Sequence, residues 1–243
     1  MRVLVIPDVH LKPWIFHRAS ELMEETETDR AVCLMDIADD WDKEFYLDLY
    51  RETYDEAIRF VAEYPESRWC YGNHDISYVY QMRESGYSLI APRLVCEKLQ
   101  ELKAALPNPE QLAFVHKIDD CIFSHAGISE VYVRRYFPFL TDYEDADKVI
   151  AQINASGSGK IWVSDEPSSP IWFRPQYYCT REEMYLPDQY LQIVGHTPVE
   201  EIQQTFDCLI SCDTFSTYRN GEPIGTQEFL LLETVTHEWK GVK

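Results

Sequence analysis

Short apolar segments that end abruptly in Asp, His or Asn constrain the possible fold of this chain more than any other feature. Residues 2–6 (RVLVI) are too few for an amphipathic helix and are rich in branched aliphatic side chains, so they predict a buried strand. Asp8 and His10 follow at once. Because open α/β sheets bind ligands at the carboxyl ends of their strands, this pair is placed where a site would form. One such pair alone is more often an ordinary turn with a histidine nearby.

The same pattern recurs after four further predicted strands, at residues 30–35, 67–71, 121–124 and 190–194. The side chains that follow these strands are Asp36, Asp39, Asn73, His74, His125 and His196. Oxygen and imidazole donors without thiolate suit Mn, Fe or Zn, whereas an all-oxygen set would suit Mg or Ca. The acids at positions 39, 40 and 42 have an alternative role, because any of them could cap the helix that follows. The recurrence at five strand ends favours a metal site over a series of turns.

Composition and charge limit the possible partners. With 243 residues, of which 45% are apolar and 14% aromatic, the chain suits one folded domain and not a disordered segment. Its net charge of −20 argues against a nucleic-acid polymer as partner, because binding the phosphate backbone requires a basic face. No apolar run approaches the roughly 18 residues of a membrane span, and no export signal is visible. We therefore expect a cytoplasmic protein without a membrane partner, whose oligomeric state the sequence leaves open.

The remaining segments give the expected order of elements. Residues 14–26 have the apolar spacing of a helix packed on a sheet, and a second such helix ends near residue 63. Residues 76–110 are helical in pattern and are interpreted as a cap inserted over one side of the site. The aromatic, proline-rich stretch 162–187 predicts a long ordered loop over the site. A second, mainly antiparallel sheet is expected to include the segments 202–205, 208–212 and 229–233.

Taken in order, the motifs resemble those of the calcineurin-like metallophosphoesterases. They span residues 8 to about 214 and read Asp8-x-His10, Asp36-x-x-Asp39, Gly72-Asn73-His74-Asp75, Ser124-His125-Ala126-Gly127 and Gly195-His196-Thr197. With Pro198, the last motif is similar to the phosphoprotein phosphatase branch and its bacterial and phage relatives. The resemblance implies a single domain over residues 1–243, folded as a four-layer α/β-β/α sandwich with the helical cap at 76–110. It also implies a dinuclear metal centre at the strand ends.

The resemblance further implies a role for each motif residue. The first metal would be held by Asp8 and His10, and Asp36 would bridge both metals. The ligands of the second metal would be Asn73, His125 and His196. The two divalent ions would be Mn, Fe or Zn, with manganese as the first expectation. Many other branches supply a further histidine where this chain has Pro198, so water would complete the first site.

Two departures from the family pattern concern the phosphate. Met35 stands where a glycine is usual, and Asp40-Trp41 stands where the branch has Arg-Gly, whose arginine resembles a phosphate clamp. Arg174 resembles a later phosphate-contacting arginine of the branch and would have to act alone. Arg134 and Arg135 are alternative clamps, although a basic pair on a helix is usually solvated surface.

The expected mechanism follows from charge. Two divalent cations would lower the pKa of a shared water, and the bridging hydroxide would attack phosphorus in line. His74 is not needed as a ligand and is assigned as the general acid, while Asp39 orients it and favours its imidazolium form. The predicted function is a metal-dependent phosphatase for phosphomonoesters, with a phosphoprotein or a small phosphorylated molecule as substrate. The alternatives are a phosphodiesterase or dinucleoside polyphosphate hydrolase, and a degenerate metal-binding scaffold.

Overall fold

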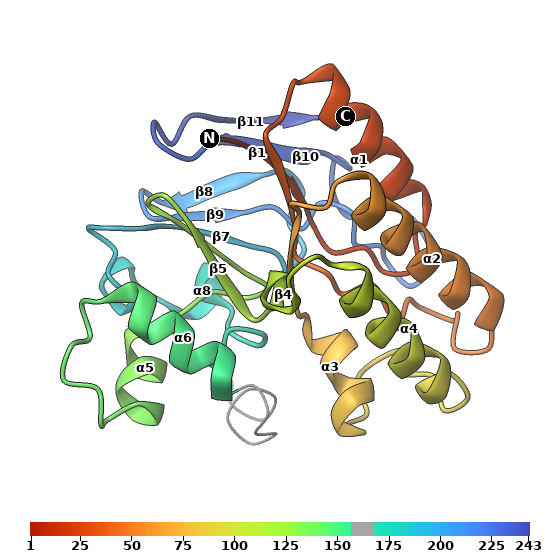
Figure 1. Ribbon diagram of the computed structural model, residues 1–243, viewed down its shortest axis with the longest axis horizontal. Coiled ribbons are helices and arrows are strands. Elements are labelled where there is room, and N and C mark those ends of the chain that lie inside the picture. The colour runs from red at the N-terminus through yellow and green to blue at the C-terminus, as the bar shows by residue number, and fades with distance from the viewer. Residues whose placement is uncertain (157–167) are drawn as a thin grey trace.

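Two β-sheets packed face to face form the centre of the fold, and each is covered on its outer face by helices (Figure 1). This computed structural model describes residues 1–156 and 168–243. The first sheet has the strand order β11-β10-β1-β2-β3-β4, and the second has the order β5-β6-β7-β9-β8. The four layers of helix, sheet, sheet and helix confirm the predicted α/β-β/α sandwich.

Parallel strands make up most of the first sheet. Its strands, from one edge to the other, are β11 (Trp239–Val242), β10 (Phe229–Glu233), β1 (Arg2–Ile6), β2 (Arg30–Cys33), β3 (Arg68–Cys70) and β4 (Leu112–Ala113). The strands from β1 to β4 run parallel, whereas β10 is antiparallel to both of its neighbours. The helices of this half are α1 (Trp14–Glu25), α2 (Leu47–Glu63), α3 (Asn73–Tyr80) and α4 (Pro92–Ala105), with a 3₁₀ turn η1 (Pro109–Gln111) before β4.

The second sheet is half parallel, so the prediction of a mainly antiparallel sheet is wrong. Its strands are β5 (Val115–Ile118), β6 (Cys121–Ser124), β7 (Leu191–Val194), β9 (Leu209–Ser211) and β8 (Gln203–Phe206). The pairs β6–β7 and β7–β9 are parallel, and the pairs β5–β6 and β8–β9 are antiparallel. The helical elements of this half are α5 (Glu130–Tyr136), α6 (Ala146–Ser156), α8 (Pro175–Tyr178) and η2 (Arg181–Glu183).

Strand β10 also differs from expectation, because it joins the first sheet beside β1. Its residues are apolar on both faces. Leu231 packs with the helices on the outer face, whereas Leu230 and Leu232 pack between the two sheets. Only a position with cover on both faces buries all three side chains, and the place next to β1 provides it.

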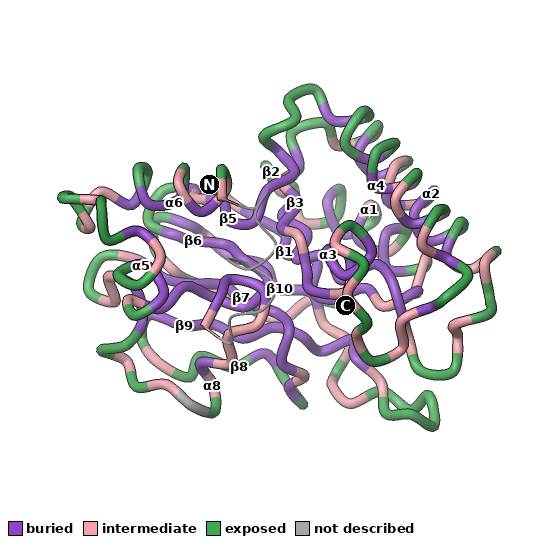
Figure 2. Tube along the Cα trace, turned by 90° about the horizontal axis from the view of Figure 1, so that it is seen from below, coloured by how far each residue is buried: buried purple, intermediate pink, exposed green. Residues whose placement is uncertain are grey.

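The alternation of side chains along β1 shows how the layers are held together. Leu4 and Ile6 belong to the core between the first sheet and its helices, and Val3 and Val5 belong to the core between the sheets. This is the two-residue period of a strand covered on both faces. Figure 2 shows the resulting buried strands at the centre, with exposure concentrated in the outer helices and loops. The central strands therefore hold their carboxyl ends in fixed positions.

Residues 76–110 contribute mainly to the helical layer of the first sheet. Helix α4 packs along α2, and its residues Val95, Leu99 and Leu102 belong to the core under that layer. From the connection between α3 and α4, residues 84–86 reach the cavity described below. The interpretation of 76–110 as a cap inserted over the site stays a prediction.

Two further expectations concern loops and membranes. Of the predicted loop 162–187, residues 162–167 lie outside the described residues, and the remainder contains α8 and η2. Within residues 1–156 and 168–243, no helix combines the length and the apolarity needed to cross a bilayer.

Candidate metal centre

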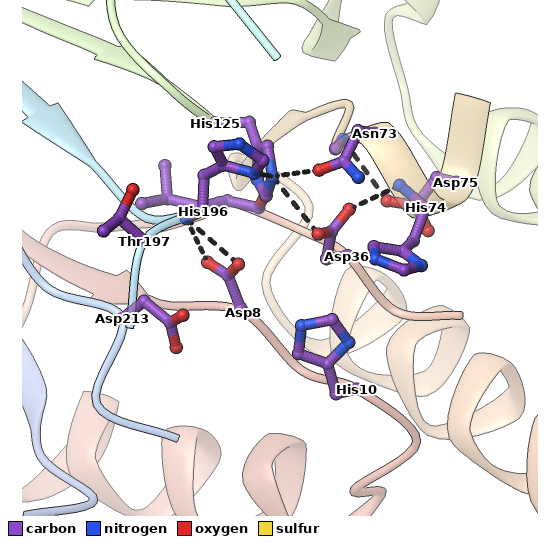
Figure 3. Close-up of polar contacts among 12 residues, drawn as sticks. Asp8, His10, Asp36, Asn73, His74, Asp75, His125, His196, Thr197 and Asp213 are labelled. Atoms are coloured by element: carbon purple, nitrogen blue, oxygen red, sulfur yellow. Dashed lines mark hydrogen bonds and ion pairs between the residues drawn. The ribbon is translucent and has the colours of Figure 1, made fainter. Parts of the chain in front are cut away.

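Side chains from the ends of five strands converge between the two sheets (Figure 3). β1, β2 and β3 belong to the first sheet and precede Asp8, Asp36 and Asn73, whereas β6 and β7 of the second sheet precede His125 and His196. Two groups of three residues each bring their ligand atoms within 4.8 Å of one another. One group consists of Asp8, His10 and Asp36, and the other of Asp36, His125 and His196. Asp36 belongs to both groups, which is the position that a bridging ligand requires. The metal roles themselves stay predictions.

Backbone carbonyls orient two of the imidazoles. Nδ1 of His10 lies 2.9 Å from the carbonyl oxygen of Asp39, and Nδ1 of His125 lies 2.9 Å from that of Leu34. A neutral imidazole that donates through Nδ1 presents Nε2 as a lone pair, and this second contact sets the ligating nitrogen at metal sites. Both rings therefore offer Nε2 to a cation.

Around Nε2 of His125, potential ligand atoms crowd together. This nitrogen lies 3.0 Å from Oδ1 of Asn73, 3.2 Å from Nδ1 of His196 and 3.2 Å from Oδ2 of Asp36. Nε2 of His196 is buried, and no residue in the described part of the chain forms a hydrogen bond with it. Converging oxygen and nitrogen lone pairs with no sulfur among them fit a divalent transition ion.

Backbone strain is concentrated at the same residues. His10, Asp36 and His196 have φ values of 43°, 40° and 61°, in the left-handed region that non-glycine residues rarely adopt. Met35, which replaces the usual glycine of the family, has a φ of 62°. Such conformations cost on the order of 1–3 kcal/mol each and cluster at functional sites. The glycine usual at position 35 would adopt this conformation without that cost.

Two glycines make room for the carboxylates. A Cβ on Gly72 would lie 2.0 Å from Oδ1 of Asp36, and a Cβ on Gly195 would lie 2.0 Å from Oδ1 of Asp8. Both carboxylates are also held by backbone amides. The amide of His74 donates to Asp36 at 2.9 Å, and the amide of His196 donates to Asp8 at 3.0 Å.

The buried carboxylates at the strand ends require a positive charge beside them. Burial raises the pKa of Asp8 well above its usual range, and the neighbouring Asp213 carboxylate raises it further. Burial lowers the pKa of His125, but Asp36 and Asp8 outweigh this effect and raise it to about 10. Without a metal, a proton on His125 offsets the buried carboxylates. A metal would displace that proton, since a ligating histidine must be neutral.

A family profile described as calcineurin-like phosphoesterase matches residues 1–216. The chain belongs to the calcineurin-like phosphoesterase family. Among solved structures, an archaeal phosphodiesterase is similar at 13% identity and a TM-score of 0.42, with 100% of this chain and 99% of that chain covered. A metallophosphoesterase from Sphaerobacter thermophilus has 17% identity and a TM-score of 0.41, with 100% and 88% covered. No curated protein matches the chain.

A protein from Thermus thermophilus is also similar to this phosphoesterase, at 9% identity and a TM-score of 0.45, with 100% of this chain and 98% of that chain covered. The family implies divalent metal ions, and the two groups of ligand atoms that share Asp36 provide candidate ligands for them.

The predicted acid of this phosphoesterase is linked to its predicted partner. Nδ1 of His74 lies 3.0 Å from Oδ2 of Asp39, whose Oδ1 accepts hydrogen bonds from the hydroxyls of Tyr50 and Tyr78. Burial lowers the pKa of His74, but Asp36 and Asp39 more than offset this and raise it to about 9. None of the acids at positions 39, 40 and 42 caps the following helix, because α2 begins only at Leu47 and has no side-chain cap.

Beside the strand ends lies a cavity of about 210 Å³, and Arg174 lies on its wall. Nη1 of Arg174 donates to Oγ1 of Thr197 at 3.1 Å and lies 3.3 Å from the carbonyl oxygen of His196. The guanidinium thus lies beside the predicted second-metal ligands. Arg134 and Arg135 do not line this cavity, and Arg134 instead pairs with Glu130 within α5.

Three residues near the site were not among the predicted site residues. Asp213 follows β9, is 1% exposed, and has its carboxylate beside Asp8 in Figure 3. Its sequence signal was the same as that of the ligands, a carboxylate after a strand. The other two residues are Lys12, whose Nζ lies 3.4 Å from Oδ2 of Asp40, and Trp41. Neither has such a signal, because their positions depend on contacts between residues far apart in sequence.

Proposed function

We propose that this phosphoesterase is a phosphomonoesterase that uses two divalent cations, manganese first among them. The first cation would be held by Asp8, His10 and Asp36, and the second by Asp36, Asn73, His125 and His196. The observation that carries the proposal is that Asp36 belongs to both ligand groups while His74 and Arg174 line the adjoining cavity. The ending with Pro198 supports a place near the phosphoprotein phosphatase branch.

The bound cations and the side chains of the protein have separate roles in the proposed reaction. Bound divalent cations supply a water of lowered pKa and offset charge on the phosphate. Because Nδ1 of His74 is held by Asp39, its Nε2 donates the proton to the leaving oxygen. The Asp39 carboxylate beside Nδ1 raises the pKa of His74 and so favours this protonated form. Arg174 binds non-bridging phosphate oxygens, for which a guanidinium is suited.

Cavity size favours a monoester over a diester. Its volume of about 210 Å³ is below the roughly 300–1,000 Å³ of pockets that enclose drug-sized ligands. A diester has a second substituent on phosphorus, for which the cavity leaves little room. The substrate is accordingly a phosphoprotein side chain or a small phosphorylated molecule. A nucleic-acid polymer is disfavoured by the net charge of −20.

The test compares p-nitrophenyl phosphate with bis-p-nitrophenyl phosphate on protein loaded in turn with Mn²⁺, Fe²⁺ and Zn²⁺. We expect kcat/KM for the monoester to exceed that for the diester by at least about tenfold, which corresponds to about 1.4 kcal/mol in transition-state binding. Faster turnover of the diester would support the phosphodiesterase alternative. Stoichiometric metal binding without turnover of either ester would support the degenerate scaffold.

A further inference from the structure

The pair Asp40-Trp41, which replaces the expected clamp Arg-Gly, ties two distant loops together. The carboxylate of Asp40 accepts hydrogen bonds from the amide of Trp41 at 2.8 Å and from Oγ1 of Thr217 at 3.2 Å. Nζ of Lys12 lies 3.4 Å from its other oxygen. These contacts join the loop after β2 to the loop that follows β9, 177 residues away along the chain. The acid is therefore neutralised and held, and the side chain presented beside it is Trp41.

The indole of Trp41 has a fixed orientation on the cavity wall. Its Nε1 donates to the carbonyl oxygen of Thr217 at 3.0 Å, and the guanidinium of Arg219 lies 5.2 Å from its ring centre. The side chain lines the cavity and is 37% exposed. Since the polar edge is bonded and Arg219 covers the ring from one side, part of the apolar surface remains open to a ligand.

The position of Trp41 relative to His74 relates it to the leaving group. Both residues line the same cavity, and Trp41 lies two residues after Asp39, which holds Nδ1 of His74. A general acid must lie beside the oxygen that it protonates, so the leaving group departs on the side of His74. The second tryptophan of the cavity, Trp172, packs instead against His196, with ring centres 5.6 Å apart.

We propose that Trp41 is a specificity-determining residue that stacks against the leaving group, and that preferred substrates are phosphate monoesters of a single aromatic ring. This inference rests on the proposed phosphomonoesterase function. The cavity of about 210 Å³ has room for a phosphate and one ring. An aryl phosphate can come from a small molecule or from a phosphotyrosine side chain, and the chemistry that Trp41 recognises is the same.

The experiment compares kcat/KM for phenyl phosphate and for n-butyl phosphate in the manganese-loaded wild type and in Trp41→Leu. Aromatic pairs contribute an amount that corresponds to about three- to tenfold in rate. We expect Trp41→Leu to lower the phenyl-to-butyl ratio by about this factor, with kcat/KM for butyl phosphate changed much less. Trp41→Phe should keep most of the ratio. The matched control is Trp239→Leu on β11, because the indole of Trp239 donates a hydrogen bond to Gln204 and does not line the cavity.

The outcomes separate the inference from the function on which it rests. Hydrolysis of both esters with the same ratio in the wild type and in Trp41→Leu would overturn the inference and leave the phosphomonoesterase function intact. Failure to hydrolyse either ester would overturn both. A phosphotyrosine peptide in the same assay shows whether the aromatic ring belongs to a protein side chain or to a small molecule. With either substrate, the inference is supported only if the preference for the aromatic ester depends on Trp41. Inhibition by phenylphosphonate and by methylphosphonate measures binding without turnover. Phenylphosphonate should inhibit the wild type more strongly, and the two should inhibit Trp41→Leu about equally.

Discussion

At the scale of single residues, His74 is the side chain whose role is most directly set by its neighbours. Asp39 accepts from its Nδ1 at 3.0 Å, and the hydroxyls of Tyr50 and Tyr78 fix the other oxygen of that carboxylate. This arrangement holds both the ring and its proton. It also leaves His74 out of the two candidate ligand groups.

Replacement of His74 by Asn should therefore remove catalysis and retain metal. We expect kcat with phenyl phosphate to fall by about 10²–10⁴-fold, the usual contribution of a general acid, while metal content is unchanged. Steady-state kinetics and elemental analysis of the same sample test this. His17→Asn, at an exposed histidine of α1, is the matched control. A kcat equal to that of the wild type would exclude His74 as the acid.

Arg174 should act mainly on binding of the phosphate. Hydrogen bonds to charged groups contribute about 1.5–3 kcal/mol, so Arg174→Ala should lower kcat/KM by about ten- to a hundredfold, chiefly through KM. Inhibition by inorganic phosphate should weaken in parallel. Arg134→Ala, which removes a guanidinium paired with Glu130 on α5, should change neither quantity. Equal phosphate inhibition in Arg174→Ala and the wild type would show that the phosphate is held elsewhere.

At the scale of elements, the strand ends could be predicted from sequence and the neighbours of the C-terminal strands could not. A short apolar run followed by a ligand-type side chain is a local signal, which is why the convergence of Asp36, His125 and the others could be predicted. The pairing of β10 with β1 joins residues more than 220 apart, such as Leu4 and Leu231, and no local pattern specifies it. The same limit applies to Trp41, whose position depends on Thr217.

Strand β5 has a buried histidine that makes folding sensitive to acid. Nε2 of His116 lies 3.1 Å from the carbonyl oxygen of Trp69 on β3, and burial, together with the charge of Arg68, lowers the pKa of His116 to about 4. The unfolded chain, with an ordinary histidine pKa near 6.5, binds this proton more readily. Stability is therefore fully present above about pH 6.5 and declines as the pH falls toward 4.

From pH 7 to pH 5, this difference amounts to about 2 kcal/mol in the free energy of unfolding. In His116→Gln, which keeps a donor for the carbonyl of Trp69 but cannot titrate, the decline over this range should be smaller by that amount. Urea unfolding of both proteins at the two pH values, with chelator present, tests the prediction. An identical decline in the two proteins would contradict it.

At the scale of the whole molecule, the candidate site joins the two sheets. Asp8, Asp36 and Asn73 extend from the first sheet, and His125 and His196 extend from the second. Metal bound between them would link the halves of the sandwich and offset carboxylates that are otherwise buried together. Folding stability and metal binding should thus be coupled.

Thermal unfolding should report this coupling. A ligand that binds only the folded state at 100 times its Kd stabilises it by about 2.7 kcal/mol per site, so Mn²⁺ should raise Tm and chelator should lower it. In His125→Ala the increase in Tm on addition of Mn²⁺ should be smaller, because a candidate ligand from the second sheet is lost. His237→Ala, at a histidine outside the candidate ligand groups, should respond as the wild type does. Equal shifts in all three proteins would mean that the metal binds elsewhere.

The most direct measurement is a calorimetric titration of metal-free protein with Mn²⁺, with the bound metal counted by elemental analysis after gel filtration. We predict two ions per chain in the wild type and a loss of binding at both sites in Asp36→Asn, because that carboxylate belongs to both ligand groups. Absence of stoichiometric metal in the wild type, or two ions retained by Asp36→Asn, would contradict it.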